Sequence, residues 1–305
     1  MNKKSSVSYI FGVAFFILFM LIFLYQFKVI DIGFLKFINE QILNIISIVF
    51  FSLFLMFILP YKKREEISKI KTNKLSKRTL IATFFILILV PVTIFSGIYL
   101  LDNKKFYIIS LLIILEIFVP FIINFEEKKP QARELIIISV LCAVAVSGRI
   151  VFASLPQFKP IVATVIIAGV CFGAETGFLV GAVSGFVSNF YFMQGPWTPW
   201  QMFALGLVGF VGGIIFNKGF IKTSRLSLSI FGFFAILIIY AGILNPSSAL
   251  LYLPNPTFYE LFIASMVSGF IFDLVHAVST AFFLYFISEP LILKLERVKT
   301  KYGLK

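Results

Sequence analysis

Apolar residues run through this chain in long stretches, and short charged segments separate them. Several stretches reach the roughly 20 residues that a helix needs to cross about 30 Å of hydrocarbon, and none alternates as a barrel strand facing lipid would. The pattern predicts an all-α integral membrane protein with about ten transmembrane helices. We place the crossings at 8–27, 41–60, 80–101, 106–124, 132–154, 161–173, 176–193, 200–216, 227–244 and 257–288.

Composition agrees with this reading, because 60% of the residues are hydrophobic and only 13% are charged. That mix lies far outside what one water-soluble core can bury.

The first run, behind Lys3 and Lys4, is longer than a secretory signal core, and no small-residue cleavage site follows it before Asp31. The two cysteines, Cys142 and Cys171, lie in apolar stretches, so we expect small core residues and neither a disulfide framework nor a metal site.

The net charge of +13 comes from basic residues that cluster between crossings. The segment 61–79 alone holds eight Lys and Arg residues and should therefore face the cytoplasm. Both termini, the linker near Lys128 and the loop 217–226 then fall on the same side, whereas the opposite connections carry little charge. We expect a multi-pass protein of the cell membrane with both termini cytoplasmic.

The two halves of the chain differ in kind. Of its 19 glycines, only Gly12, Gly33 and Gly97 precede residue 130, and both tryptophans follow it. The polar stretch 125–130 reads as a linker. We therefore expect an accessory four-helix membrane module over 1–128 and a functional six-helix module over 129–305.

Small residues recur every four positions in two crossings of the second half. Gly173, Gly177, Gly181 and Gly185 should lie on one helix stripe, which favours close packing between helices. Ser139, Ala143 and Ser147 repeat at the same interval. Packing is the simplest role for both faces, although the partner of the second could be another protein.

An outward turn holds the densest set of candidate ligand-binding groups. Prolines and a glycine fix the positions of Trp197 and Trp200, and the amides of Asn189, Gln194 and Gln201 flank them. Such rings can form an aromatic belt at the membrane interface. An apolar platform with a few placed polar groups is also what a small-molecule pocket requires, and we favour the pocket.

Ionisable residues inside crossings are candidate functional groups. Arg149 lies near the outward end of its crossing and could meet a carboxylate, amide or phosphate of a ligand. Asp273 and His276, spaced i and i+3, share a helix face as either a structural pair or a proton site. The sequence contains neither a nucleophile-elbow motif nor a P-loop, so it indicates no enzyme, no cofactor and no ATP hydrolysis by this chain.

These residues together resemble a known family over slightly more than half of the chain, 132–300. The matching stretches are Ala132-Arg-Glu-Leu, Ala143-Val-Ala-Val-Ser-Gly-Arg149, Leu155 to Pro160, Gly169 to Asn189, and Gln194-Gly-Pro-Trp-Thr-Pro-Trp-Gln-Met202. They are similar to the substrate-binding S components of energy-coupling factor (ECF) vitamin transporters. The stretch at 194–202 is the most specific of them.

The resemblance implies a six-helix subunit that binds a vitamin or related micronutrient on its outward side and delivers it by toppling in the membrane. Its partners would be a membrane coupling (T) protein and two ATPase subunits. The family docks the coupling protein through a small-residue face, which maps here onto Ser139, Ala143 and Ser147 and departs from the usual alanine pair. Within the family, the chain looks closest to a branch associated with cobalamin-type corrinoids.

Two other functions stay open from the sequence. An ion-coupled secondary transporter would use Asp273 and His276, but the glycine-poor first half does not mirror the second as inverted repeats would. A membrane scaffold that transports nothing is the other alternative.

Overall fold

The computed structural model describes residues 6–26, 28, 30–38, 40–58, 84–101, 107–116, 132–217, 219–253 and 257–302. Helices account for nearly all of these residues, and none of them lies in a strand. The helices of the first half are α1 (Ser6–Gln26), η1 (Gly33–Phe37), α2 (Glu40–Ile58), η2 (Phe85–Leu89), α4 (Val90–Leu101) and the run Tyr107–Glu116. Those of the second half are α6 (Ala132–Val151), α7 (Ile161–Phe172), α8 (Ala174–Phe192), α9 (Thr198–Gly212), η3 (Gly213–Asn217), α10 (Arg225–Ala235), η4 (Ile236–Tyr240), α11 (Ala241–Tyr252), η5 (Tyr259–Ala264) and α12 (Ser265–Tyr302).

The predicted all-α membrane fold is therefore confirmed. Among the described residues, Thr198–Asn217, Arg225–Tyr252 and Tyr259–Tyr302 are long and apolar enough to cross a membrane, and further apolar helices are shorter. The loop 61–79 and the linker 125–130 lie outside the described residues.

Two helices run past their predicted ends. The ninth crossing, predicted over 227–244, continues to Tyr252 with Pro246 inside it, because Ala249 still packs against the bundle. The last crossing, predicted to end at 288, continues to Tyr302 beyond Pro290. There the Lys299 ammonium donates a 2.7 Å hydrogen bond to the carbonyl of Cys171 at the end of α7, so the charged end of α12 is held across the bundle.

Helix α7 forms the centre of the six-helix bundle of the second half. Every residue from Ile161 to Cys171 is buried, and α7 contacts α6, α8, α9 and α12. A helix that is apolar all round is expected in such a central place. Both cysteines are free, and Cys171 is buried in this core as expected.

Glycines bring α7, α8 and α9 into main-chain contact. A Cβ atom on Gly177 of α8 would lie 2.5 Å from the carbonyl oxygen of Gly209 on α9, and one on Gly181 would lie 2.5 Å from that of Leu205. A Cβ on Gly169 of α7 would also meet Gly209. The predicted packing role is confirmed for Gly177, Gly181 and Gly185, whereas Gly173 precedes α8 with φ +102° and does not contact α9 in this way.

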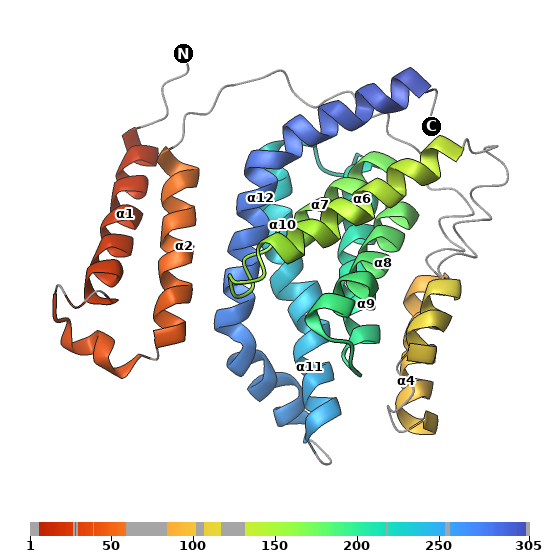
Figure 1. The fold of residues 1–305 in the computed structure, drawn as a ribbon, viewed down its shortest axis with the longest axis horizontal. Coiled ribbons are helices and arrows are strands. Elements are labelled where there is room, and N and C mark those ends of the chain that lie inside the picture. The colour runs from red at the N-terminus through yellow and green to blue at the C-terminus, as the bar shows by residue number, and fades with distance from the viewer. Residues whose placement is uncertain are drawn as a thin grey trace.

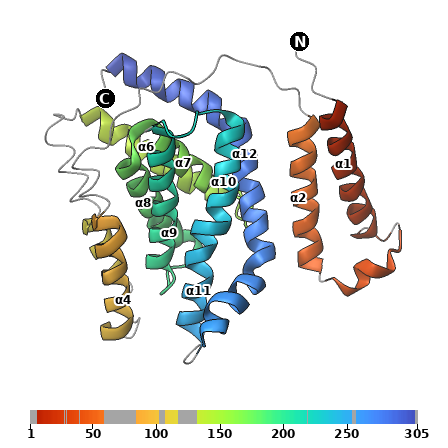
Figure 2. The ribbon, with the colours of Figure 1, turned by 180° about the vertical axis from the view of Figure 1, so that it is seen from behind.

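The helices of the first half flank the bundle on opposite sides (Figures 1 and 2). Helices α1 and α2 pack together, and α2 contacts α12. Helix α4 instead contacts α9. Thr93 of α4 donates a hydrogen bond to Glu116, which joins α4 to the run Tyr107–Glu116. The division of the chain at 128/129 stays a prediction.

Candidate functional site

A hydrogen-bonded relay of polar side chains crosses the interior of the six-helix bundle. It begins at Arg149 on α6, whose guanidinium donates to the Asn189 Oδ1 atom on α8 at 2.8 Å and to the Ser188 hydroxyl. Asn189 is only 1% exposed, so this amide is withdrawn from solvent. An arginine that is hydrogen-bonded to a buried amide among apolar helices is a candidate functional site.

The relay continues from Asn189 to two further helices. The Asn189 Nδ2 atom donates to Gln201 Oε1 on α9 at 2.9 Å and to the Thr198 hydroxyl at 3.1 Å. Gln201 in turn donates from Nε2 to the hydroxyl of Tyr240 in η4 at 3.1 Å. Side chains from α6, α8, α9 and η4 thus form one network, which we call the Arg149–Tyr240 relay.

An aromatic and cationic group borders the relay. The Arg149 guanidinium lies 4.5 Å from the ring centroid of Phe192, and the Lys159 ammonium lies 4.8 Å from the same centroid. Burial and the Arg149 guanidinium both lower the pKa of Lys159. Two cations beside one ring make this side of the site attractive to carbonyl, hydroxyl or anionic oxygens of a ligand.

Tyr240 connects the relay to α12. Its ring meets that of His276 edge to face, with centroids 4.9 Å apart, and His276 is buried. Sequence reasoning missed Tyr240, Lys159 and Phe192 as members of the site. Only Lys159 carried a signal, as a lone cation in a charge-poor outward connection.

Gln194 holds the predicted outward turn together. Its Oε1 atom accepts a hydrogen bond from the Thr198 hydroxyl, and its Nε2 atom donates to the carbonyl of Phe186 at 2.8 Å. The half-buried Trp197 packs on Gly195, where a Cβ would lie 2.3 Å from the ring. Thr198 belongs to both the turn and the Arg149–Tyr240 relay, so hydrogen bonds join the two.

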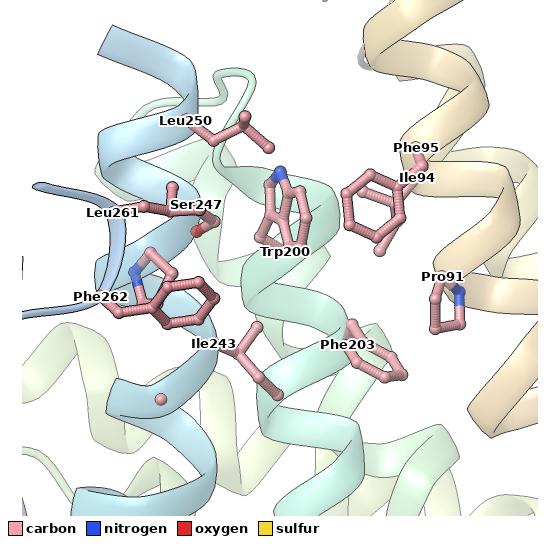
Figure 3. A pocket seen from close by; sticks show the side chains of 12 residues that line it. Pro91, Ile94, Phe95, Trp200, Phe203, Ile243, Ser247, Leu250, Leu261 and Phe262 are labelled. Carbon is pink, nitrogen blue, oxygen red and sulfur yellow. The ribbon is translucent and has the colours of Figure 1, made fainter. Parts of the chain in front are cut away.

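Trp200 points into a different environment from the relay. It is buried, and it lines a cavity of about 350 Å³ together with Phe203 and side chains from α4 and α11 (Figure 3). Phe95 of α4 meets its ring edge to face, with centroids 5.5 Å apart. Arg149, Asn189 and Gln201 do not line this cavity.

Asp273 and His276 do not form a pair with each other. Asp273 accepts a 2.6 Å hydrogen bond from the amide of Asn245 on α11, whereas His276 packs against Tyr240. Their spacing places them on neighbouring parts of α12, but each side chain meets a different residue of the facing helix.

The face formed by Ser139, Ala143 and Ser147 is exposed on α6. Val140 and Val144 beside it are also exposed, 54% and 48% respectively. These small residues therefore do not pack inside the bundle. The simpler of the two roles expected for them, packing between helices of this chain, is wrong. Small exposed side chains of this kind would let another helix approach α6 closely.

Comparison with known proteins places the chain in a family. The model of the ECF-type riboflavin transporter S component matches residues 129–297. The chain belongs to this family of transporter subunits, as the resemblance predicted. The description of the family names riboflavin, so it gives no support to the corrinoid expected from the sequence.

One curated relative also matches part of the chain. The UPF0397 protein VS_II0189 of Vibrio atlanticus (strain LGP32) is 26% identical over 126 residues, which cover 39% of this chain and 69% of that protein. No solved structure matches the chain.

Proposed function

We propose that this chain is the substrate-specific subunit of an ECF transporter and binds riboflavin or a closely related flavin on its outward side. The observation that carries the proposal is the Arg149–Tyr240 relay, which gathers hydrogen-bonding groups from four elements in a membrane protein of this family. The family description supports the flavin.

The chemistry of a flavin matches these groups. Its ring system presents carbonyl oxygens and an imide N–H along one edge, and its side chain carries hydroxyls. Arg149 can donate to the carbonyl oxygens, and the amides of Asn189 and Gln201 can both donate and accept. A ligand that enters would replace hydrogen bonds inside the relay with bonds to itself, so the site loses little hydrogen bonding when it opens.

Aromatic side chains supply the apolar part of the proposed site. Phe192 borders Arg149, and Trp197 is the residue before α9, where its ring packs on Gly195. A planar ring system gains dispersion energy against such faces. Trp200 was also predicted to line the ligand pocket. It lines the apolar cavity, so we propose that only Trp197 contacts the flavin, and a prediction below separates the two tryptophans.

We propose that ATP hydrolysis by separate subunits drives uptake, because this chain contains no P-loop. The partners would be a coupling (T) protein and two ATPase subunits. The exposed strip of Ser139, Ala143 and Ser147 on α6 is the proposed docking face, since small residues let a partner helix approach closely.

Ion-coupled transport is the competing function. It rested on Asp273 and His276 acting together, and the two side chains have different partners. Under our proposal, riboflavin uptake in cells persists with a protonophore as long as ATP is maintained, and stops when the ATPase subunits are deleted. Uptake that survives the deletion and collapses with the protonophore would establish the competing function.

Ligand identity tests the proposal itself. The purified full chain should carry riboflavin or a related flavin, detected by mass spectrometry after release from the protein, and should bind added riboflavin in preference to cobalamin. Recovery of a corrinoid, or failure to bind any flavin, would overturn the proposed substrate.

A further inference from the structure

We propose that the apolar cavity beside Trp200 is a binding site for a hydrocarbon chain of a membrane lipid. The cavity lies between α4, α9, α11 and η5 (Figure 3). This inference goes beyond the proposed function, because the cavity uses no member of the Arg149–Tyr240 relay.

The walls of the cavity are almost entirely hydrocarbon. They are formed by Pro91, Ile94, Phe95, Trp200, Phe203, Gly242, Ile243, Pro246, Ser247, Leu250, Leu261 and Phe262. The side-chain polar groups among them are the Ser247 hydroxyl and the Trp200 indole N–H. The hydroxyl already donates a 2.9 Å hydrogen bond to the Leu244 carbonyl within its own helix.

This lining selects the chemistry of the occupant. A buried water needs about two to four polar partners, and apolar cavities without them stay dry. A polar ligand would lose its hydrogen bonds on entry, which costs free energy. A hydrocarbon chain loses nothing, and the indole N–H leaves one donor for an ester oxygen of the same lipid.

The cavity also reaches the outer surface of the helices, where lipid acyl chains are present. Two of its lining rings, Phe95 and Phe262, are 43% and 41% exposed, so they lie at the outer surface of the helices as well as at the cavity. In a protein that spans a membrane, that surface meets lipid. Trp200 lies deeper, at 9% exposed, and it also lines the cavity.

A lipid in this place would join the two halves of the protein. One wall of the cavity belongs to α4, and the other walls belong to α9, α11 and η5. The direct bridge between α4 and α9 near the cavity is the contact of Phe95 with Trp200. A chain between them would extend that contact and help to hold α4 against the six-helix bundle.

Fluorescence quenching by brominated lipids tests the proposal. The chain holds two tryptophans, so Trp197→Phe leaves Trp200 as the single indole. This full-length variant is reconstituted in phosphatidylcholine vesicles with plain or mid-chain brominated acyl chains, without added flavin. We expect bromination to lower the emission of Trp200 severalfold.

Filling the cavity supplies the decisive comparison. A Cβ on Gly242 would meet nothing within 4 Å, so Gly242→Leu can fill the space without a clash at its first carbon. In the same single-tryptophan background it should abolish most of the quenching. The control is Ser248→Leu, because exposed Ser248 is the neighbour of Ser247, bonds the same Leu244 carbonyl and does not line the cavity. It should leave the quenching unchanged.

Two results would overturn the proposal. Equal quenching of Trp200 with and without Gly242→Leu would show that no chain occupies the cavity. A second result would assign the cavity to the flavin ring instead. In it, Gly242→Leu made in the otherwise unaltered chain folds but does not bind riboflavin, and bromination does not change the emission of Trp200. Thermal unfolding of each variant checks that the protein measured is folded.

Discussion

Arg149 on α6 donates a 2.8 Å hydrogen bond to the side chain of Asn189 on α8, 40 positions later in the chain. Asn189 is 1% exposed and therefore withdrawn from solvent, and the Arg149 guanidinium satisfies its side-chain oxygen. The bond also fixes the ends of α6 and α8 that carry these two residues relative to one another. A ligand that replaces this hydrogen bond would change the contacts of both helices at once.

The close packing of α8 on α9 should be intolerant of a single methyl group. We predict that Gly177→Ala lowers the stability of the folded protein by about 1–3 kcal/mol, because its Cβ would lie 2.5 Å from the Gly209 carbonyl oxygen. Gly242→Ala is the matched control, since that Cβ meets nothing within 4 Å. Thermal unfolding in detergent compares the two, and equal midpoints would show that the helices separate without cost.

The exposed small-residue strip of α6 should control assembly. We predict that Ala143→Phe prevents copurification with the coupling protein and stops uptake, while riboflavin affinity of the isolated chain is unchanged. The bulky ring would keep a partner helix from approaching. Val267→Phe, at a position that is 71% exposed on α12, serves as the control and should assemble normally. Normal assembly of Ala143→Phe would move the docking face elsewhere.

The direction of the chain in the membrane can be read by cysteine labelling. We predict that Gln157→Cys reacts with an impermeant reagent from outside the cell and that Lys222→Cys reacts only after the membrane is opened, because basic loops stay cytoplasmic. Both positions are exposed. The ends of α1 and α12 that carry the termini lie at the same end of the molecule (Figure 1), so one labelling pair reports on both. The reverse pattern would invert the proposed topology.

The two tryptophans should differ in their effect on substrate binding. We predict that Trp197→Ala weakens riboflavin binding by about 1–3 kcal/mol, roughly 5- to 150-fold, as for other aromatic anchors. Trp200→Ala should leave the affinity of the folded fraction unchanged, because Trp200 faces the apolar cavity. Calorimetric titration normalised to folded protein separates these effects. Unchanged affinity in both variants would remove the indoles from the site.

Much of the fold follows from the sequence, since long apolar runs and glycine spacing depend on local pattern alone. The sequence also placed Arg149 and Asn189 at the same predicted end of their crossings, and the structure adds the hydrogen bond between them. The sequence did not predict that the two indole rings lie in different surroundings. Trp197 packs on Gly195 in the turn, whereas the Trp200 ring meets Phe95 of α4, so the two rings have different neighbours although they are three positions apart.

Tyr240 could not be found from the sequence for a related reason. It stands among Ile and Leu in the ninth crossing, and nothing in that pattern distinguishes an inward hydroxyl. Tyr240 ends the π-helical turn Ile236–Tyr240, and Asn245 lies five residues further along the same run of helix. Tyr240 therefore meets His276 while Asn245 meets Asp273.

The affinity of an Asn189 variant for riboflavin tests the central claim most directly. Asn189→Leu removes the amide that links Arg149 to Gln201, while Asn217→Leu removes another buried amide, which donates to the Val170 carbonyl outside the relay. We predict that Asn189→Leu weakens riboflavin binding by about 1–3 kcal/mol, roughly 5- to 150-fold, measured calorimetrically on folded protein. Asn217→Leu should reduce stability alone. Riboflavin binding of equal strength in Asn189→Leu and the unaltered chain would contradict the assignment of the relay as the substrate site.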